Sequence, residues 1–234
     1  MSPTAIVTGA TQGIGAAIAK HLAKQKFSLA ICARNQNDLD QMKTELAQLG
    51  SPEVYTFCVD LSQKQSAIEF AQSALAQLTT VDILVNNAGV FIPGAICEEP
   101  EGQLERMMEL NVYAAYAITR VIVPSMKLRQ KGHIFNMCSV ASLKAYQHGG
   151  AYSISKYALL GFSENLREEL KEYHIKVTAL NPGATFSRSW QGSAVPEERI
   201  MPAEDVAKIL WATYDLSAQT DVEMVVMRPQ FGDL

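Results

Sequence analysis

A glycine-rich turn between a predicted strand and a predicted helix constrains the fold of this chain more than any other feature. Thr4-Ala5-Ile6-Val7 is a short apolar run typical of a buried strand, and an apolar helical pattern runs from Ile14 to Leu22. The turn between them, Thr8-Gly9-Ala10-Thr11-Gln12-Gly13-Ile14-Gly15, has the spacing Gly-x-x-x-Gly-x-Gly rather than the common Gly-x-Gly-x-x-Gly. Because glycines admit close backbone approach and a helix start offers free N–H groups, the sequence predicts a cradle for a pyrophosphate.

Strand-like and helix-like segments alternate along the rest of the chain. We expect strands to begin near Thr4, Ser28, Val54, Val81, His133, Lys176 and Glu223. We expect helices over residues 16–26, 37–49, 64–78, 102–129, 151–173 and 203–216. The run Ile83-Leu84-Val85 is apolar on both faces, as in a parallel strand covered on both sides. The alternation predicts an α/β fold of Rossmann type, a doubly wound parallel sheet with helices on both faces, in a single domain spanning residues 1–234.

A tyrosine and a lysine lie four residues apart in Ala151-Tyr152-Ser153-Ile154-Ser155-Lys156, thirteen residues after Ser139. Residues i and i+4 share a helix face, so this spacing sets an ammonium beside a phenol. A phenol titrates near pH ~10, and a neighbouring cation favours the phenolate. We therefore expect Tyr152 to give and take a proton near neutral pH, beside a Ser139 hydroxyl that can hold a carbonyl or alcohol oxygen. Taken alone, the spacing also fits a solvated helix face.

Taken in order, the motifs of this chain resemble those of the short-chain dehydrogenase/reductase family along nearly its whole length. Thr8-Gly9-x-x-x-Gly13-Ile14-Gly15 resembles its cofactor loop, Asn86-Asn87-Ala88-Gly89 its mid-sheet motif, and Pro182-Gly183 the motif after its sixth strand. The catalytic tetrad of the family matches Asn111, Ser139, Tyr152 and Lys156 in order and spacing. The resemblance implies about seven strands in the order 3-2-1-4-5-6-7. It also implies hydride transfer between a nicotinamide and a carbonyl or secondary alcohol.

The resemblance assigns a role to each member of the tetrad. Tyr152 donates the proton, and Ser139 helps it to hold the oxygen that gains charge. Lys156 lowers the pKa of Tyr152 and binds the nicotinamide ribose. Asn111 loosens its helix and holds a water against Lys156, which begins a proton relay to solvent.

The cofactor contacts implied by the resemblance form one set along the carboxyl ends of the strands. Asp60 would receive the adenine amino group, although Asp60 and Ser62 could instead cap the helix near Lys64. Asn86 is expected to lock the sheet rather than touch the cofactor, and residues 188–201 are expected to form a substrate lid. The expected contacts are Gly9, Thr11, Gly13, Ile14, Gly15, Arg34, Asp60, Leu61, Asn87, Ala88, Gly89, Tyr152, Lys156, Pro182, Gly183 and Thr185.

The end of the second predicted strand favours NADP(H) over NAD(H). Ala33 stands where NAD-preferring relatives carry an acid for the ribose hydroxyl, and Arg34 follows it. A guanidinium suits a 2′-phosphate, although Arg34 could also be a solvated residue at a strand end. Gln12 departs from the pattern, because some NADP-preferring relatives carry a basic residue there.

Composition excludes several other classes of protein. The net charge of −4 argues against nucleic acid as a partner, and no apolar stretch reaches the ~18 residues that span a bilayer. The first strand begins almost at the N-terminus, so we expect no signal peptide and a cytoplasmic location. Cys32, Cys58, Cys97 and Cys138 show neither pairing nor metal-ligand spacing, so we expect buried free thiols and no metal.

The substrate stays open. A 3-oxoacyl thioester on acyl carrier protein is one candidate, since Lys127, Arg129 and Lys131 offer basic charge to that acidic carrier, but the acidic run 168–172 opposes it. A small ketone, a pteridine-like carbonyl or a sugar is an equal alternative. A cofactor-binding regulator without turnover would need a broken tetrad, and this tetrad is intact. The longer epimerases and dehydratases related to this family use another glycine spacing.

The two long helical patterns suggest assembly of several copies. Residues 102–129 and 151–173 carry small or apolar residues on more than one face, and a helix apolar on two sides usually packs on two sides. Examples are Ala114, Ala115, Ala117, Ala158 and Gly161. In the family, these helices form a subunit interface, so we expect a homotetramer, with a dimer as the alternative. The other interpretation is that these residues all face the sheet.

Overall fold

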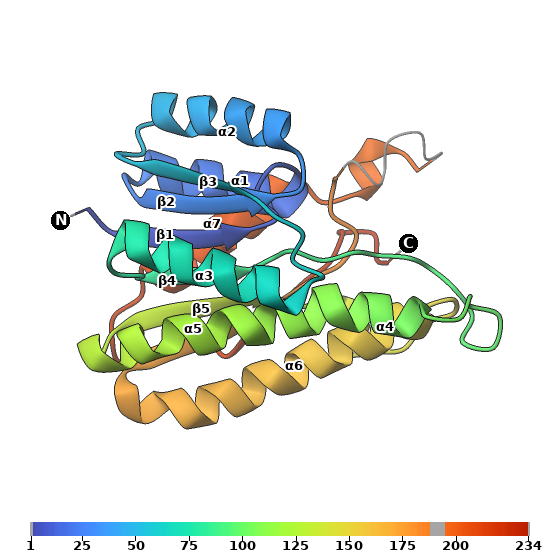
Figure 1. Ribbon diagram of the computed structural model, residues 1–234. Helices are drawn as coiled ribbons and strands as arrows, with labels where there is room; N and C mark the ends of the chain where they lie inside the picture. Colours follow the sequence, from blue (N-terminus) through green and yellow to red (C-terminus); the bar gives the residue numbers. More distant parts are fainter. Residues whose placement is uncertain (1, 188–194, 234) are drawn as a thin grey trace.

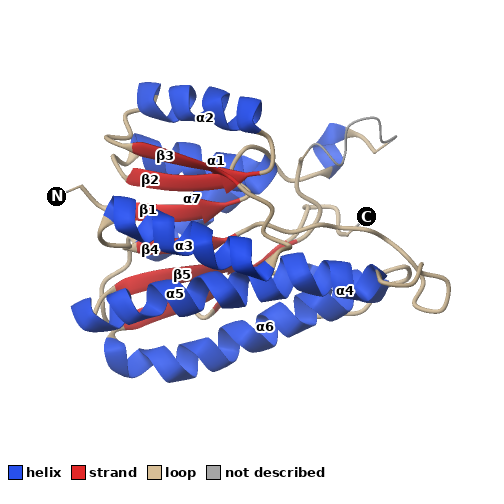
Figure 2. Ribbon diagram, in the orientation of Figure 1, coloured by secondary structure: helices blue, strands red, loops and turns tan. Residues whose placement is uncertain are grey.

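The computed structural model describes residues 2–187 and 195–233. It contains a seven-stranded sheet in the order β3-β2-β1-β4-β5-β6-β7, in which every neighbouring pair is parallel (Figures 1 and 2). The predicted fold class and strand order are therefore confirmed. The strands are β1 (Thr4–Thr8), β2 (Ser28–Ala33), β3 (Val54–Cys58), β4 (Ile83–Asn86), β5 (Gly132–Met137), β6 (Ile175–Pro182) and β7 (Met224–Met227).

The helices follow the predicted order with one correction. The segment predicted as one helix over 102–129 is divided into α4, a π-helical turn over Glu109–Tyr113 and α5. Short 3₁₀ turns cover Val140–Ser142, Lys171–Tyr173 and Glu197–Arg199. The α-helices are α1 (Gly13–Lys24), α2 (Gln36–Gln48), α3 (Lys64–Leu78), α4 (Gln103–Met108), α5 (Ala114–Arg129), α6 (Gly150–Leu170) and α7 (Ala203–Tyr214).

Helices cover both faces of the sheet, because each central strand carries apolar side chains on both of its faces. In β1, Val7 packs into a core cluster with residues of α1, α2 and α7, whereas Ile6 packs into another with α3, α5 and α6. Figure 1 shows α3, α5 and α6 in front of the sheet and α1 and α7 behind it. Strands buried on both faces are what a parallel sheet requires.

A buried chain of polar side chains fastens α6 to the sheet. Asn86 Nδ2 donates to Asn136 Oδ1 at 2.8 Å and to Thr119 Oγ1 at 3.1 Å. Asn136 Nδ2 in turn donates to Ser163 Oγ of α6 at 2.8 Å. Asn86 therefore joins the neighbouring strands β4 and β5, as predicted. The hydrogen bond from Asn136 to Ser163 holds α6 over β5. Among the described residues, no helix is long and apolar enough to cross a membrane.

Candidate active site

Tyr152, Lys156 and Ser139 meet beyond the carboxyl end of β5. Tyr152 lies in the first turn of α6 and Lys156 one turn later, while Ser139 lies two residues after the end of β5 and caps the 3₁₀ turn that comes next. Ser139 Oγ accepts a hydrogen bond from Ala141 N at 3.1 Å, and a hydrogen bond joins its side chain to that of Tyr152. Because one lone pair of Ser139 is held by the backbone, its hydroxyl is oriented beside the phenol.

The two titratable groups of the tetrad differ from the expectation drawn from their spacing. Burial raises the pKa of Tyr152 to about 12, although the hydrogen bond with Ser139 opposes that shift. Burial lowers the pKa of the Lys156 ammonium to about 8. Lys156 Nζ donates to Met137 O at 2.7 Å and lies 5.8 Å from the centre of the Tyr152 ring. The predicted lowering of the Tyr152 pKa by Lys156 is therefore wrong for this structure, because desolvation outweighs a cation that is directed at a carbonyl.

Asn111 lies within the π-helical turn between α4 and α5, where the regular hydrogen-bond ladder is interrupted. Its Oδ1 accepts from Val90 N at 2.8 Å, and its Nδ2 donates to Val90 O at 3.1 Å and to Ser155 Oγ at 2.9 Å. A β-carbon added at Gly89 would lie 3.0 Å from Asn111 Oδ1 and 3.6 Å from Lys156 Nζ, so both groups converge on that glycine. The helix is loosened at Asn111 as predicted, but its amide is occupied by protein partners.

The glycine turn is built for close backbone approach. Gly9 has φ +63° and Gly13 has φ +53°, a region that favours glycine. A β-carbon on Gly15 would collide with Gly9 O and with the side-chain amide of Asn87. The N-cap residue of α1, Gln12, makes no side-chain cap, and the first turn of α1 carries no acid. The first amides of α1 therefore form a positive, uncapped cradle that fits a phosphate group.

A second polar cluster fastens this turn to the end of β4. Asn87 Nδ2 donates to Thr8 O at 2.8 Å and to Gly9 O at 3.1 Å. Thr8 Oγ1 accepts from the amides of Asn87 and Ala88, each at 2.9 Å. The side chain of Asn87 thus shapes the cradle from behind. The role of Thr8 was not anticipated, since a threonine at a strand end gives no local signal of a contact 79 residues away.

The residues expected at the adenosine end lie together where β2 and β3 end. Ala33 pairs in register with Cys58, and the Cys58 thiol donates to Arg34 O at 3.4 Å. Arg34 and Asp60 are exposed, and Asp60 Oδ1 accepts from Ser62 N at 3.0 Å. Asp60 forms a turn rather than a helix cap, because the N-cap residue of α3 is Gln63. Leu61 is buried beside this cluster.

The segment after β6 folds back along the chain that leads into α7. Thr185 forms a bridge with Met201, and Phe186 N donates to Met201 O at 2.8 Å. Ser139 Oγ lies 3.5 Å from Pro182 O, which places this segment beside the tetrad. Gly183 N donates to Met227 O at 2.7 Å. Of the lid expected over 188–201, residues 188–194 lie outside the described part of the chain.

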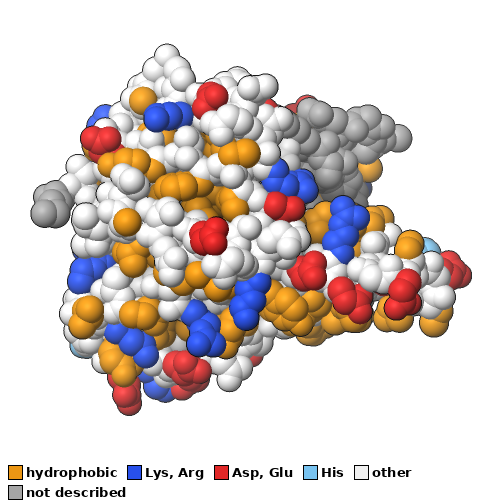
Figure 3. Space-filling view, in the orientation of Figure 1, with side chains coloured by type: hydrophobic (Ala, Val, Ile, Leu, Met, Phe, Trp, Pro, Cys, Tyr) orange, Lys and Arg blue, Asp and Glu red, His pale blue; other side chains and the backbone are white. Residues whose placement is uncertain are grey.

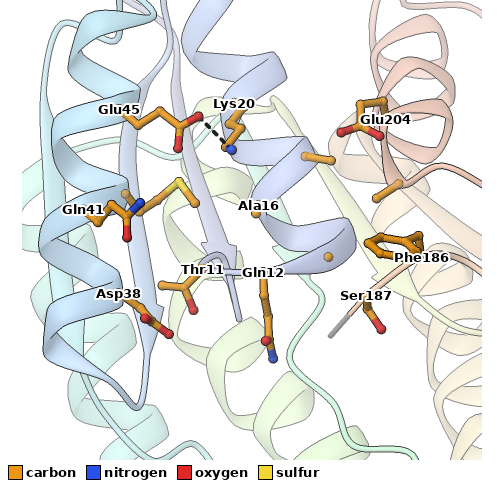
Figure 4. A pocket seen from close by; sticks show the side chains of 14 residues that line it. Thr11, Gln12, Ala16, Lys20, Asp38, Gln41, Glu45, Phe186, Ser187 and Glu204 are labelled. Atoms are coloured by element: carbon orange, nitrogen blue, oxygen red, sulfur yellow. Dashed lines mark ion pairs between the residues drawn. The ribbon is translucent and has the colours of Figure 1, made fainter. Parts of the chain in front are cut away.

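A hollow of about 320 Å³ lies over the start of α1, close to the glycine turn (Figure 4). Thr11, Gln12 and Asp38 line it, and an ion pair of 2.7 Å between Lys20 and Glu45 crosses its far side. None of the tetrad residues lines this hollow. It therefore borders the cradle for the phosphates and is not the place of the chemistry.

The four cysteines are free thiols, and two of them are exposed. Cys32 and Cys138 are buried, whereas Cys58 and Cys97 are exposed, so the expectation of buried thiols is wrong for two of them. Cys58 is the last residue of β3, the edge strand of the sheet, and Cys97 lies in the loop between β4 and α4. Within residues 2–187 and 195–233, no group of three His, Cys, Asp or Glu side chains could hold a metal ion.

Two residues near Tyr152 were missed from the sequence. The Phe91 ring lies edge-on to the Tyr152 ring, with centres 4.8 Å apart and planes at 78°. Glu99 accepts hydrogen bonds from Ala151 N, one residue before Tyr152. Both belong to the loop between β4 and α4, and neither forms a motif.

Comparisons with known proteins agree with this geometry. Residues 3–196 match the family described as short chain dehydrogenase. A sepiapterin reductase of Chlorobaculum tepidum is 29% identical over 238 residues, covering 98% of this chain and 97% of the relative. An alcohol dehydrogenase from the archaeon Thermococcus sibiricus, complexed with 5-hydroxy-NADP, superposes with a TM-score of 0.91 at 27% identity and covers 100% of this chain and 99% of its own.

A second solved structure carries the other nicotinamide cofactor. A 7α-hydroxysteroid dehydrogenase, complexed with NADH and 7-oxo glycochenodeoxycholic acid, has a TM-score of 0.87 at 26% identity and covers 99% of this chain and 94% of its own. The chain belongs to the short-chain dehydrogenase family. It is an NAD(P)-dependent oxidoreductase that acts on carbonyl and CH–OH groups.

Proposed function

We propose that this short-chain dehydrogenase uses NADPH to reduce the carbonyl group of a small molecule, with Tyr152 as the proton donor. The observation that supports this most is the meeting of Tyr152, Ser139 and Lys156 beside the cradle for the phosphates. With a pKa of about 12, the phenol carries its proton at neutral pH and can give it to an oxygen that gains charge. A bound reduced nicotinamide supplies the hydride that reduces the carbonyl carbon.

The remaining members of the tetrad position and supply that proton. Ser139, oriented by Ala141 N, shares the substrate oxygen with Tyr152 and stabilises its developing charge. Lys156 would bind the ribose of the cofactor and would return a proton to Tyr152 after each turnover. Asn111 acts by holding the Val90 backbone and Ser155, and a water that feeds Lys156 would bind at the π-helical turn around it, where the regular hydrogen-bond ladder is interrupted.

The residues that would hold the cofactor line one edge of the sheet. The backbone of Gly9, Thr11, Gly13, Ile14 and Gly15 would take the pyrophosphate, because the helix start beside them is positive and uncapped. Asp60 and Leu61 would hold the adenine. The remaining contacts, along the nicotinamide half, would come from Asn87, Ala88, Gly89, Pro182, Gly183 and Thr185.

The same edge supports a preference for NADPH over NADH. No acid stands at Ala33, and the exposed Arg34 guanidinium follows it where β2 ends. Among the described residues, Arg34 has no ion-pair partner, so its guanidinium is available to a 2′-phosphate. The complex of the Thermococcus sibiricus relative with an NADP derivative is consistent with this preference.

Negative charge around α4, beside the proposed active site, favours a small free substrate over a thioester on an acidic carrier protein. Acidic side chains gather around α4 and the loop before it (Figure 3), and Glu98, Glu101 and Glu105 are exposed there. An acidic acyl carrier protein would meet like charge at this face. A pteridine-like carbonyl is the alternative supported by the similarity to a sepiapterin reductase. A cofactor-binding regulator without turnover stays the alternative of another class.

Assembly into a homotetramer, or into a dimer through α5 and α6, is part of the proposal. Ala114, Ala115 and Ala117 are buried within the chain, the first and third in the core cluster beneath α3, α5 and α6 and Ala115 in a cluster with Leu159 and Leu160 of α6, so none of the three supports an interface. Exposed apolar side chains lie elsewhere on α5 and α6, at Tyr116, Ile154 and Tyr157, and on the preceding segment, at Leu104 of α4 and Tyr113 of the π-helical turn. Figure 3 shows apolar side chains along the face over α4 and α6.

The proposed activity is tested with a panel of carbonyl substrates, each with NADPH and with NADH. The panel includes a small diketone, a pteridine, a ketose and a 3-oxoacyl thioester. We expect absorbance of the reduced nicotinamide to fall with at least one small ketone and faster with NADPH. No consumption of either cofactor with any carbonyl, while both cofactors bind, would favour the regulator instead.

A further inference from the structure

The catalytic helix lacks a cap of its own. Helix α6 begins at Gly150, and its N-cap residue, Gly149, has no side chain that could accept a hydrogen bond. The first turn of α6 also contains no acidic residue. Tyr152 is the third residue of this helix, so it lies in the first turn. The amides of this turn have no acceptor within the helix, and a helix frays most readily at its ends.

A remote carboxylate supplies the missing cap. The two carboxylate oxygens of Glu99 accept from Ala151 N at 3.0 and 3.2 Å, across 52 residues of chain. Ala151 holds the second position of the helix, one of those that capping groups bind. A carboxylate at a helix start also interacts favourably with the helix dipole. Glu99 therefore acts on the turn that carries Tyr152 without touching the phenol itself.

The surrounding backbone is shaped to admit this carboxylate. A β-carbon on Gly150 would collide with Glu99 Oε1, and one on Gly94 would lie 2.5 Å from Glu99 Cγ. Gly94 N donates to His148 O at 3.0 Å, a second bond between the same loop and the approach to α6. The loop also carries Phe91, whose ring meets the Tyr152 ring edge-on at 4.8 Å. Three contacts from one loop thus surround the first turn of α6.

We propose that Glu99 is a positioning residue for Tyr152, which it holds in place by capping α6 from the loop between β4 and α4. The inference rests on the proposed role of Tyr152 as proton donor. Loss of the cap would let the first turn of α6 fray and displace the phenol from the substrate oxygen. A displacement of about 1 Å can cost up to about 100-fold in rate, so we expect a fall in kcat of about 10-fold or more.

The test compares Glu99→Ala with two matched variants. Glu99→Gln keeps the length and an acceptor oxygen, so it should recover most of kcat. Glu69→Ala removes an exposed acid of α3 and should leave kcat within about twofold of the native value. Cofactor affinity should change little in all three, since the contacts of Lys156 and the glycine turn are retained.

Amide hydrogen exchange of the peptide that contains residues 150–155 is measured on the same variants and needs no substrate. Faster exchange at this peptide in Glu99→Ala, with a lower kcat that Glu99→Gln restores, is the expected result. Unchanged exchange, or an unchanged kcat in a folded Glu99→Ala protein, would overturn the proposal. If Glu99→Ala does not fold, Glu99→Asp, whose shorter side chain cannot reach Ala151 N, is measured against the same two outcomes. A native protein that reduces no carbonyl would refute the proposed function, while the exchange data would still decide the role of Glu99.

Discussion

Buried titratable side chains lie at both ends of the parallel sheet, and the two ends differ in how these side chains are arranged. At the amino end, His133 Nε2 and Thr178 Oγ1 are 2.8 Å apart, and burial lowers the pKa of His133 to about 3. Burial alone would raise the pKa of Asp82, but hydrogen bonds from Thr4 N and Arg129 outweigh it and lower that pKa. These groups are satisfied by neighbours within the sheet and the adjoining helix.

At the carboxyl end, the shifted groups converge on the place where strands end and loops begin. Lys156 is buried there beside Ser139, and Tyr152 is half-buried. The glycine turn follows β1, which pairs with β4 at the point where the strand order reverses. A shifted pKa therefore does not by itself mark a functional site, because the pKa of His133 is strongly lowered at the amino end of the sheet, away from the tetrad. Convergence at the carboxyl edge, where the strand order reverses, is the better criterion.

The largest effect is expected from the removal of one oxygen at the carboxyl end of the sheet. Tyr152→Phe should lower kcat by roughly 10²–10⁴-fold, because the proton donor is lost. Cofactor affinity and the free energy of unfolding should change little, since the ring and its contact with Phe91 remain. Steady-state rates, cofactor fluorescence and urea unfolding measure the three quantities, with Tyr157→Phe on the exposed face of α6 as the control.

At the amino end, replacement of His133 should change the stability of the protein and leave turnover unchanged. The folded pKa of His133 lies near 3 and the unfolded pKa near 6.5, so only the unfolded state takes up this proton between these values. Native stability should fall as pH drops from about 6.5 to 3, by on the order of 4 kcal/mol from this group. The lowered pKa of Asp82 acts in the same direction at lower pH.

His133→Phe should flatten this part of the profile, because a phenyl ring takes up no proton. Urea unfolding between pH 4 and 7 measures the slope, and His174→Phe serves as the control at a residue outside the core. If the free energy of unfolding of His133→Phe depended on pH as it does in the native protein, His133 would not be the source of this pH dependence.

The proposed role of Lys156 predicts a dependence of the reaction rates on pH. Its pKa of about 8 means that the ammonium loses its proton as pH rises through that value. The rate of reduction, which needs the charged relay, should fall about tenfold per pH unit well above that pKa, whereas oxidation of the alcohol should speed up. Rates in both directions from pH 6 to 10 provide the test. A reduction rate that stays flat to pH 10 would show that Lys156 does not feed Tyr152.

The smallest expected effect concerns cofactor choice at the end of β2. Ala33→Asp together with Arg34→Leu should move the ratio of NADPH to NADH affinity toward NADH by about 10-fold or more, since a charge-assisted contact with the 2′-phosphate is lost. Fluorescence titration of both cofactors measures the ratio, with Lys43→Leu on the exposed face of α2 as the control. Equal native affinities for the two cofactors would contradict the role of Arg34.

Local signals in the sequence predicted much of the fold. The strands β1, β2 and β3 begin at the predicted residues, and α3 spans the predicted 64–78, because turns and apolar runs bound them. The π-helical turn around Asn111 was not visible as a break, since the apolar pattern continues through it. The burial of Ala114 and Ala117 against the core depends on how α5 turns toward the sheet, which periodicity alone does not give.

The site was predictable where residues form motifs and unpredictable where distant segments meet. The proximity of Ser139 and Tyr152 follows from a short loop, and the structure brings them together. The cap of α6 by Glu99 joins segments 52 residues apart and has no local signal. The sign of the Tyr152 pKa shift was also missed, because spacing reveals a nearby cation but not the desolvation that opposes it.

The most direct test of the contrast between the two ends is to measure turnover and unfolding on Tyr152→Phe and His133→Phe side by side. The account predicts that Tyr152→Phe loses turnover by at least about 100-fold while its stability stays within about 1 kcal/mol of native. It predicts that His133→Phe keeps native turnover while its stability loses the dependence on pH between 6 and 4. Near-native turnover in Tyr152→Phe would contradict the assignment of the proton donor and the account built on it.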